Sequence, residues 1–253
     1  MTLTTLTITD LTRMGGTRVC IAGINETGQT IRPELDHASI HEDWLFIDGI
    51  PRLVPFARIQ FDLLEPFPDA PHTEDWIVRQ DYKQPIGSIS NHNRQEFLQR
   101  YAFDTVDEIF ETEIAHESGF GYFIPYGEGV RSLGTILPNR CYDFVHIQYE
   151  NGSIDYRLGF RDQCGKNYRL KITDLALRNY VDHLRIQQRL SFEQISAQLS
   201  ETISSRHTYL RIGLARPTDP RHPGFCHLQI NGVYTFPDYL NGRCFADFRP
   251  DMN

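Results

Sequence analysis

The sequence predicts a mainly β protein with a few helices, divided into two parts. The chain has 253 residues, of which 40% are hydrophobic and 23% charged, a composition that excludes disordered, collagen-like and coiled-coil proteins. Short segments in which polar and apolar residues alternate recur between turn residues, a pattern typical of small barrels. The formal net charge of −8 is divided unevenly, with −11 on residues 1–125 and +3 on residues 126–253. This asymmetry indicates two parts with different roles.

The second part begins with three predicted strands. They are expected at residues 141–149, 153–162 and 167–172. Asn151-Gly152, between the first two, is a strong signal for a tight hairpin turn. Strict alternation in the second and third segments places Leu158 and Leu170 in the core. We therefore expect a three-stranded meander.

Helices and two further strands follow this meander. The first helix is expected to begin at Thr173, whose hydroxyl can accept a hydrogen bond from the first turn. The second begins at Ser191, with Gln194 three residues later as a capping box. The last two strands are predicted at residues 208–216 and 225–232. Three strands, a helical segment and two strands is the order of elements in an OB barrel, a five-stranded barrel.

The first part is harder to interpret. Strands are predicted at residues 5–12, 17–24, 57–65 and 75–78. A helix is predicted over residues 93–101, and a capping box formed by Thr105 and Glu108 predicts another through residues 109–116. The residues alone give no topology for these elements.

We place the domain boundary in the glycine-rich segment 119–134. The N-terminal domain, residues 1–125, is acidic and ends in a helical segment. The C-terminal domain, residues 126–253, carries the inserted helices. We therefore expect two domains of similar length.

Several segments resemble the dual OB-fold domain proteins of bacteria and archaea. The matching segments are VCIAGINETGQTIRP (19–33), HTEDW (72–76), RSLGTILP (131–138), YRLGFRDQCGKNYRLKITDLALRNY (156–180), YLRIGLARP (209–217) and HLQINGVYTFPDYL (227–240). They are spread over nearly the whole chain, in the order of the family. The resemblance implies tandem OB-fold-like five-stranded barrels and a nucleic-acid-binding module, linked to bacterial defence or conflict systems. It implies no catalytic residues.

Alternation places four cations on one face of the hairpin between the second and third strands of the C-terminal barrel. They are Arg157, Arg161, Arg169 and Lys171. In OB folds that bind oligonucleotides this face contacts the ligand. The neighbouring Asp155 and Asp162 reduce the positive potential, and the alternative interpretation is an ordinary solvated face.

A second candidate group lies in the segment YLRIGLARP. If Leu210 and Ile212 face the core, Tyr209 and Arg211 face outwards together, as an aromatic and a cation suited to stacking on bases. Arg216 extends the positive charge towards the following loop. The alternative is that these arginines pair with carboxylates of the acidic first half.

Enzyme functions have weaker support. His72, Glu74 and Asp75 resemble a metal-binding string, and a metal-dependent hydrolase in the acidic half is a third hypothesis. The chain has no Walker loop, GxGxxG, GxSxG or HExxH motif, and its five widely spaced cysteines include no CxxC pair. We therefore expect no catalytic residues, no metal site, no cofactor and no disulfide framework.

The leading hypothesis is a non-catalytic module that binds single-stranded DNA or RNA. The main alternative is a protein-interaction adaptor whose acidic N-terminal half docks a basic partner. No segment is apolar enough to span a membrane, and the N-terminus lacks the features of a secretory signal. We therefore expect a cytoplasmic protein that does not contact membranes, and the family resemblance implies a prokaryotic one.

Overall fold

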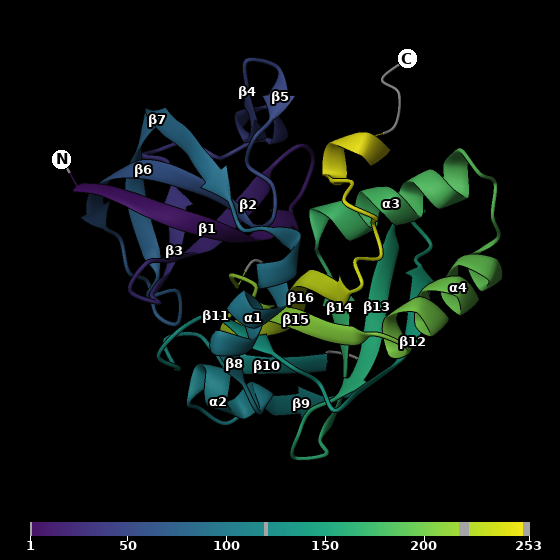
Figure 1. Cartoon of the computed structure of the whole chain (residues 1–253). Coiled ribbons are helices and arrows are strands. Elements are labelled where there is room, and N and C mark those ends of the chain that lie inside the picture. The colour runs from purple at the N-terminus through teal and green to yellow at the C-terminus, as the bar shows by residue number, and fades with distance from the viewer. Residues whose placement is uncertain (1, 119–120, 218–222, 250–253) are drawn as a thin grey trace.

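The first barrel is a closed sheet of five strands. The computed structural model describes residues 2–118, 121–217 and 223–249, and this barrel is the purple and blue part of Figure 1. Its strands are β1 (Thr2–Arg13), β2 (Val19–Asn25), β3 (Thr30–Glu34), β6 (Ala57–Pro66) and β7 (Asp75–Ser88). The order in space is β1-β2-β3-β7-β6, and β3 is parallel to β7. The third and fifth strands of the barrel are therefore neighbours, and the first pairs with the fourth.

Three short elements lie between the third and fourth strands of this barrel. They are the 3₁₀ helix η1 (Glu42–Leu45) and the strands β4 (Phe46–Ile47) and β5 (Ile50–Pro51). β4 and β5 pair only with each other among the described strands. The barrel wall is therefore left intact by this insertion.

A linking segment connects the two barrels. It contains α1 (Asn91–Arg100), β8 (Ala102–Phe103), α2 (Val106–Phe110), β9 (Ala115–Glu117) and β10 (Gly121–Pro125). β8 pairs with β11 (Leu133–Ile136), and β10 pairs with β16 (Phe225–Phe236), so both extend the second sheet. The boundary at residues 125 and 126 stays a prediction, and these two strands precede it.

Thr105 caps a helix that is shorter than predicted. The Thr105 hydroxyl accepts a hydrogen bond from the Glu108 amide at 3.2 Å, as expected, but the Glu108 carboxylate accepts from the Asp104 amide at 3.1 Å, so the reciprocal half of the predicted capping box is not formed. The helix ends at Phe110, because Glu111 adopts a left-handed conformation with φ of 53°. The expectation of helix through residue 116 is therefore wrong, and Ala115–Glu117 is a strand.

The second barrel contains the five strands and two helices predicted between residues 141 and 232, together with β11 and a 3₁₀ helix that were not predicted. After β11 come β12 (Arg140–Gln148), β13 (Ile154–Arg161), β14 (Asn167–Ile172), α3 (Leu175–Ile186), α4 (Phe192–Ser204), β15 (His207–Leu214), β16 and the 3₁₀ helix η2 (Phe245–Phe248). The strand order is β12-β13-β14-β16-β15-β11, with β14 parallel to β16. Only residues 137–139 separate β11 from β12, so the two ends of this path are one interrupted first strand. The tandem OB-fold-like barrels are confirmed.

The helix starts in this barrel follow local hydrogen bonding. Ser191 and Gln194 form the predicted capping box of α4. For α3 the cap is Asp174, which accepts hydrogen bonds from the amides of Ala176 and Leu177 at 2.9 and 3.1 Å. Thr173 is not the cap, because its hydroxyl donates to the Ile230 carbonyl at 3.1 Å. No helix in the described ranges is long and apolar enough to cross a membrane.

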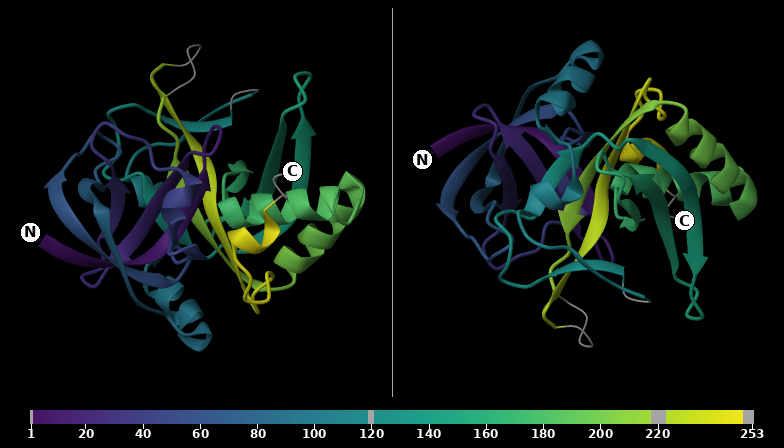
Figure 2. Two further views of the ribbon diagram at one scale, coloured as in Figure 1. Left: turned by 90° about the horizontal axis from the view of Figure 1, so that it is seen from above. Right: turned by 90° about the horizontal axis from the view of Figure 1, so that it is seen from below.

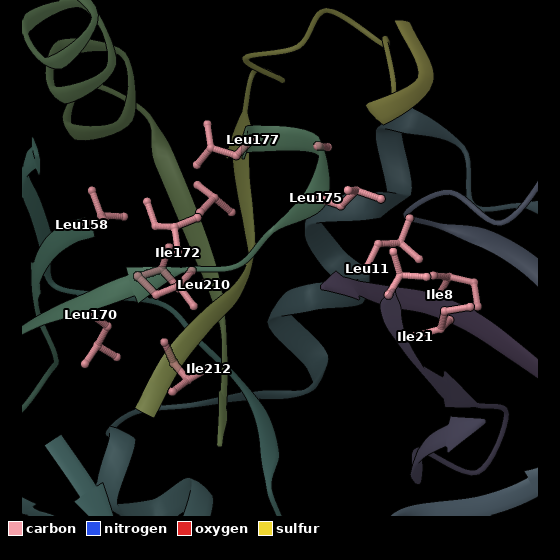
Figure 3. Packing of buried hydrophobic residues seen from close by; sticks show 14 of the residues in the cluster. Ile8, Leu11, Ile21, Leu158, Leu170, Ile172, Leu175, Leu177, Leu210 and Ile212 are labelled. Carbon is pink, nitrogen blue, oxygen red and sulfur yellow. The ribbon is translucent and has the colours of Figure 1, made fainter. Parts of the chain in front are cut away.

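The two barrels share one hydrophobic core. Buried side chains of both barrels belong to a single cluster, and Figure 3 shows Leu175, at the start of α3, between residues of the second barrel and Leu11 of the first. The Arg13 amide donates to the Thr173 carbonyl at 2.7 Å, and the Tyr234 hydroxyl donates to the Thr9 carbonyl at 2.7 Å. In both views of Figure 2, the yellow strand β16 runs between the first barrel and the helices α3 and α4. The barrels are therefore held in a fixed relation.

Leu158→Asp and Leu170→Asp are expected to unfold the second barrel. Both leucines are buried in the core, and an unpaired buried carboxylate costs about 3–5 kcal/mol, a large part of the stability of a domain. Urea unfolding followed by circular dichroism measures the loss. Gln148→Asp, at an exposed position of β12, is the matched control and should unfold like the wild type. A Leu158→Asp protein that melts cooperatively at the wild-type midpoint would show that the side-chain register of β13 is wrong.

Candidate functional site

A cleft of about 1270 Å³ lies between the two barrels. One wall comes from the first barrel, with residues 12–16 and 18–20 of the β1–β2 hairpin, residues 32–34 of β3 and residues 38–40 after it. The opposite wall comes from β13, β14, α3, β16 and the end of β15. We call this the inter-barrel cleft.

Positive charge dominates the walls of the inter-barrel cleft. The described residues that line it include eight cations and two carboxylates: Arg13, Arg18, Arg32, Arg157, Arg169, Lys171, Arg178 and Arg216 against Glu34 and Asp155. The chain as a whole carries −8. Five of these cations are ion-paired, in part with carboxylates outside the lining, so the surplus of positive charge rests on the other three. Cations without a paired carboxylate attract anions.

Three of the four cations predicted on the β13–β14 face line the cleft. Arg157 and Lys171 stand directly opposite each other across the two strands, and Arg169 is on the same strand as Lys171. The fourth, Arg161, is exposed beyond the cleft and donates a hydrogen bond to Asn167 at 3.0 Å. The structure therefore brings together most of this predicted group, and its role in binding stays a prediction.

Two of the three cations on the β13–β14 face form ion pairs with carboxylates of the second barrel. Lys171 pairs with Asp155 at 2.8 Å, and Arg169 pairs with Asp143. All four of these side chains are solvent-accessible to some degree, so each pair contributes little stability and can exchange for another anion. The ion pairs orient the cations along the cleft wall and leave them accessible to an anionic ligand.

Arg18, Arg157 and Arg178 line the cleft without an ion pair to any described carboxylate. Arg18 donates to the Gly15 carbonyl at 3.2 Å, and Arg178 donates to the carbonyls of Ile172 and Ile154 at 3.1 and 3.3 Å. Burial lowers the pKa of Arg178, and the nearby Arg13 lowers it further. The cleft therefore holds cations whose charge an anionic ligand would compensate.

The expectation that Tyr209 and Arg211 face solvent is wrong. Each is only 1% exposed. Both point away from the interior of the second barrel, as alternation predicts, but the first barrel and the linking segment cover that face. Tyr209 packs against Phe56 and Leu98. Arg211 pairs with Asp10 of β1 at 2.9 Å, so the alternative interpretation, pairing with the acidic half, describes it.

Arg216 fits both interpretations of its segment, as a cation of the cleft and as a partner of carboxylates in the acidic half. It lines the cleft, and it pairs with Asp75, with Asp69 at 3.3 Å and with Glu34 at 3.5 Å, all from the first half of the chain. Arg32 pairs with the same Asp75 at 2.5 Å. Two arginines and three carboxylates thus join the barrels along one side of the cleft.

The metal-binding string is built differently from a metal site. Asp75 is occupied by Arg32 and Arg216, and Glu74 accepts hydrogen bonds from the amide and hydroxyl of Ser132, both at 2.9 Å. Among the described residues, no group of three His, Cys, Asp or Glu side chains is arranged to hold a metal ion. These carboxylates support the junction between the first barrel and β11.

Sequence reasoning missed four cations of the cleft, namely Arg13, Arg18, Arg32 and Arg178. The first two flank Gly15-Gly16, between the strands predicted at residues 5–12 and 17–24, so the signal available was a pair of arginines at a hairpin end. Arg178 lies in the predicted helix, but only the packing of α3 beside β13 and β14 shows which way that position faces. The sequence does not show how the two barrels pack against each other, and this packing decides which cations line the cleft.

His72 is expected to make folding sensitive to acid. It is fully buried, and burial, together with Arg32 and Arg216, lowers its pKa to about 2. In the unfolded chain a histidine has a pKa of about 6.5, so below that pH the unfolded state gains a proton that the folded state does not. The contribution of His72 to the free energy of unfolding is therefore fully present above pH 6.5 and decreases as the pH falls below it. We expect about 1 kcal/mol less stability at pH 5.5 than at pH 7, measured by urea unfolding. His72→Leu should lack this component, and equal losses in both proteins would contradict the prediction.

The comparisons with known proteins agree with this architecture. A family model described as a dual OB-containing domain matches residues 8–233, most of the chain. A comparison with curated proteins found no match. Both barrels lie largely within the matched residues, and both have the strand order expected from the sequence resemblance. The chain belongs to the dual OB-containing domain family.

Proposed function

We propose that the protein is a non-catalytic module that binds single-stranded DNA or RNA in the inter-barrel cleft. The observation that carries the proposal is the row of eight cations along the described cleft walls. Three of them, Arg18, Arg157 and Arg178, have no ion pair to a described carboxylate. OB-fold domains generally bind nucleic acids or proteins. A phosphate backbone supplies one negative charge per nucleotide, which a row of arginines recognises without regard to sequence.

The position of the cleft on the second barrel supports this proposal. OB folds that bind oligonucleotides use the face of their second and third strands, bordered by the loops after the first and fourth strands. Those strands are β13 and β14 here, and they contribute Arg157 and Lys171 to the cleft. The two bordering loops contribute Tyr149 and Arg216. The cations therefore lie where the fold presents a ligand-binding surface.

The acidic half acts with the second barrel in this proposal. The β1–β2 hairpin supplies Arg13 and Arg18, and β3 supplies Arg32, so the first barrel forms the opposite cationic wall. The first 125 residues still carry a net charge of −11. Their remaining surface repels a polyanion and thereby confines it to the cleft.

A protein-interaction adaptor is the alternative function, since the acidic surface of the first half suits a basic protein partner. A place in a bacterial defence or conflict system is a further expectation that follows from the family resemblance. Oligonucleotide binding separates the two functions, because the adaptor requires a protein ligand and the nucleic-acid module does not.

Reversing the charge of two cleft cations is expected to abolish oligonucleotide binding. In Arg157→Glu/Arg169→Glu, two phosphate contacts are lost and two repulsive charges are added, so affinity should fall about 100-fold or more. Fluorescence anisotropy with labelled single strands measures the affinity, and thermal melting checks that the variant folds. Arg58→Glu/Arg100→Glu, outside the cleft and with the same change in net charge, is the matched control and should bind nearly as well as the wild type. Wild-type affinity in the folded cleft variant would remove this face from consideration and favour the adaptor.

A further inference from the structure

We infer that Tyr149 is the base-stacking residue of the inter-barrel cleft and makes it selective for unpaired nucleotides. This inference rests on the proposed function and adds a contact that reads the base face in addition to the phosphates. Tyr149 lies in the turn between β12 and β13, lines the cleft and is 41% exposed. Figure 2 shows that this hairpin projects from the second barrel.

The ring of Tyr149 is available for a ligand. None of the ring contacts among the described residues involves it, whether aromatic or cationic. Tyr122, the other tyrosine of the cleft, is already engaged: its ring centroid lies 4.3 Å from that of His116 and 4.9 Å from that of Tyr168. Its hydroxyl also donates to the Asn167 carbonyl at 2.7 Å. Tyr122 is therefore part of the protein's own packing, whereas Tyr149 is exposed and has no such ring contact among the described residues.

Hydrogen bonds hold Tyr149 in place next to the phosphate-binding cations. Its hydroxyl donates to Asp155 at 3.0 Å, and Asp155 in turn pairs with Lys171 at 2.8 Å. Lys171 stands opposite Arg157 across the two strands. A nucleotide whose base lies on the ring therefore has two cations within reach of its phosphate. Because the side chain is already oriented, stacking costs little conformational entropy.

The turn that carries Tyr149 is also well ordered by its own contacts. The Tyr149 amide donates to the Ser153 carbonyl at 2.9 Å, and its carbonyl accepts from the Gly152 amide at 2.9 Å. The Asn151 side chain accepts from the amide and hydroxyl of Ser153 at 3.0 and 2.7 Å. The ring thus stands on a closed hairpin turn.

Strand selectivity follows from what the ring can contact. In a duplex each base is covered on both faces by its neighbours, so a tyrosine can stack only after unstacking, which costs a few kcal/mol. A single strand exposes base faces at no such cost. Stacking on an aromatic side chain contributes about 1–3 kcal/mol per base and tolerates any sequence. The cleft should therefore bind unpaired strands of any sequence more tightly than duplexes.

The test uses three labelled probes and four proteins. The probes are a mixed-sequence strand of about 12 nucleotides, the same strand annealed to its complement, and a strand in which abasic sites replace the bases. The proteins are the wild type, Tyr149→Ala, Tyr149→Phe and Phe67→Ala. Phe67 is exposed on the first barrel outside the cleft, so its variant controls for loss of an exposed ring.

Tyr149→Ala should bind the intact single strand about 5- to 150-fold more weakly than the wild type does. It should bind the abasic strand and the duplex as the wild type does, because neither offers a free base face. Tyr149→Phe, which keeps the ring, and Phe67→Ala should stay close to wild-type affinity. Wild-type binding of the intact strand by Tyr149→Ala would overturn the inference, and so would an equal loss on the abasic strand. In either case the charge-reversal variant still decides the proposed function. Failure of the wild-type protein to bind any probe would overturn both.

Discussion

The buried ion pair between Arg211 and Asp10 fixes how the two barrels are placed. Both side chains are 1% exposed, and the Arg211 guanidinium also donates to the Thr135 hydroxyl at 2.9 Å. Removing one partner of a buried pair costs about 3–5 kcal/mol, because the other charge remains without compensation. The pairing of each strand shifts register at this point, between Ile8 and Asp10 in β1 and between Arg211 and Ile212 in β15. Such irregularities redirect side chains, and here they accompany the contact between the two barrels.

The inter-barrel cleft depends on this contact. Its two walls belong to different barrels, so the cleft exists only while the barrels are packed together. Arg13 continues from β1 into the β1–β2 hairpin, so the strand that carries Asp10 also carries a cation to the cleft. The group around Asp75, which pairs with both Arg32 and Arg216, connects the walls a second time. Since the barrels share one hydrophobic core, the spacing of the cleft cations is set before any ligand arrives.

The sequence predicts the second barrel well and identifies part of the cations that line the inter-barrel cleft. Alternation in β13 and β14 correctly separates Leu158 and Leu170 from the cations, because one face of these strands packs on the core and the other is open. For β15 the same rule assigns the faces but not their surroundings. Tyr209 and Arg211 do lie on the face opposite Leu210, yet another barrel covers that face. A period-two pattern distinguishes two faces of a strand and contains no information about a second domain packed on one of them.

The first barrel shows a different reason for incomplete prediction. Its strand segments are visible in the sequence, but the parallel contact between β3 and β7 joins residues about 40 positions apart, and nothing local specifies it. The sequence therefore does not show that Arg13 and Arg18 belong to the cleft, because this depends on the placement of their hairpin opposite β13 and β14. Arg178 needs the same long-range information, since a helical position becomes a cleft position only through the packing of α3.

The salt dependence of oligonucleotide binding tests the central claim most directly. A labelled single strand is titrated with the wild-type protein by fluorescence anisotropy at salt concentrations from about 50 to 200 mM. If about four phosphates are contacted, the logarithm of the binding constant should fall linearly with the logarithm of salt, with a slope of about −3, from a micromolar or tighter dissociation constant at the lowest salt. The absence of binding at about 50 mM salt, or an affinity that does not change with salt, would contradict the account of a phosphate-binding cleft.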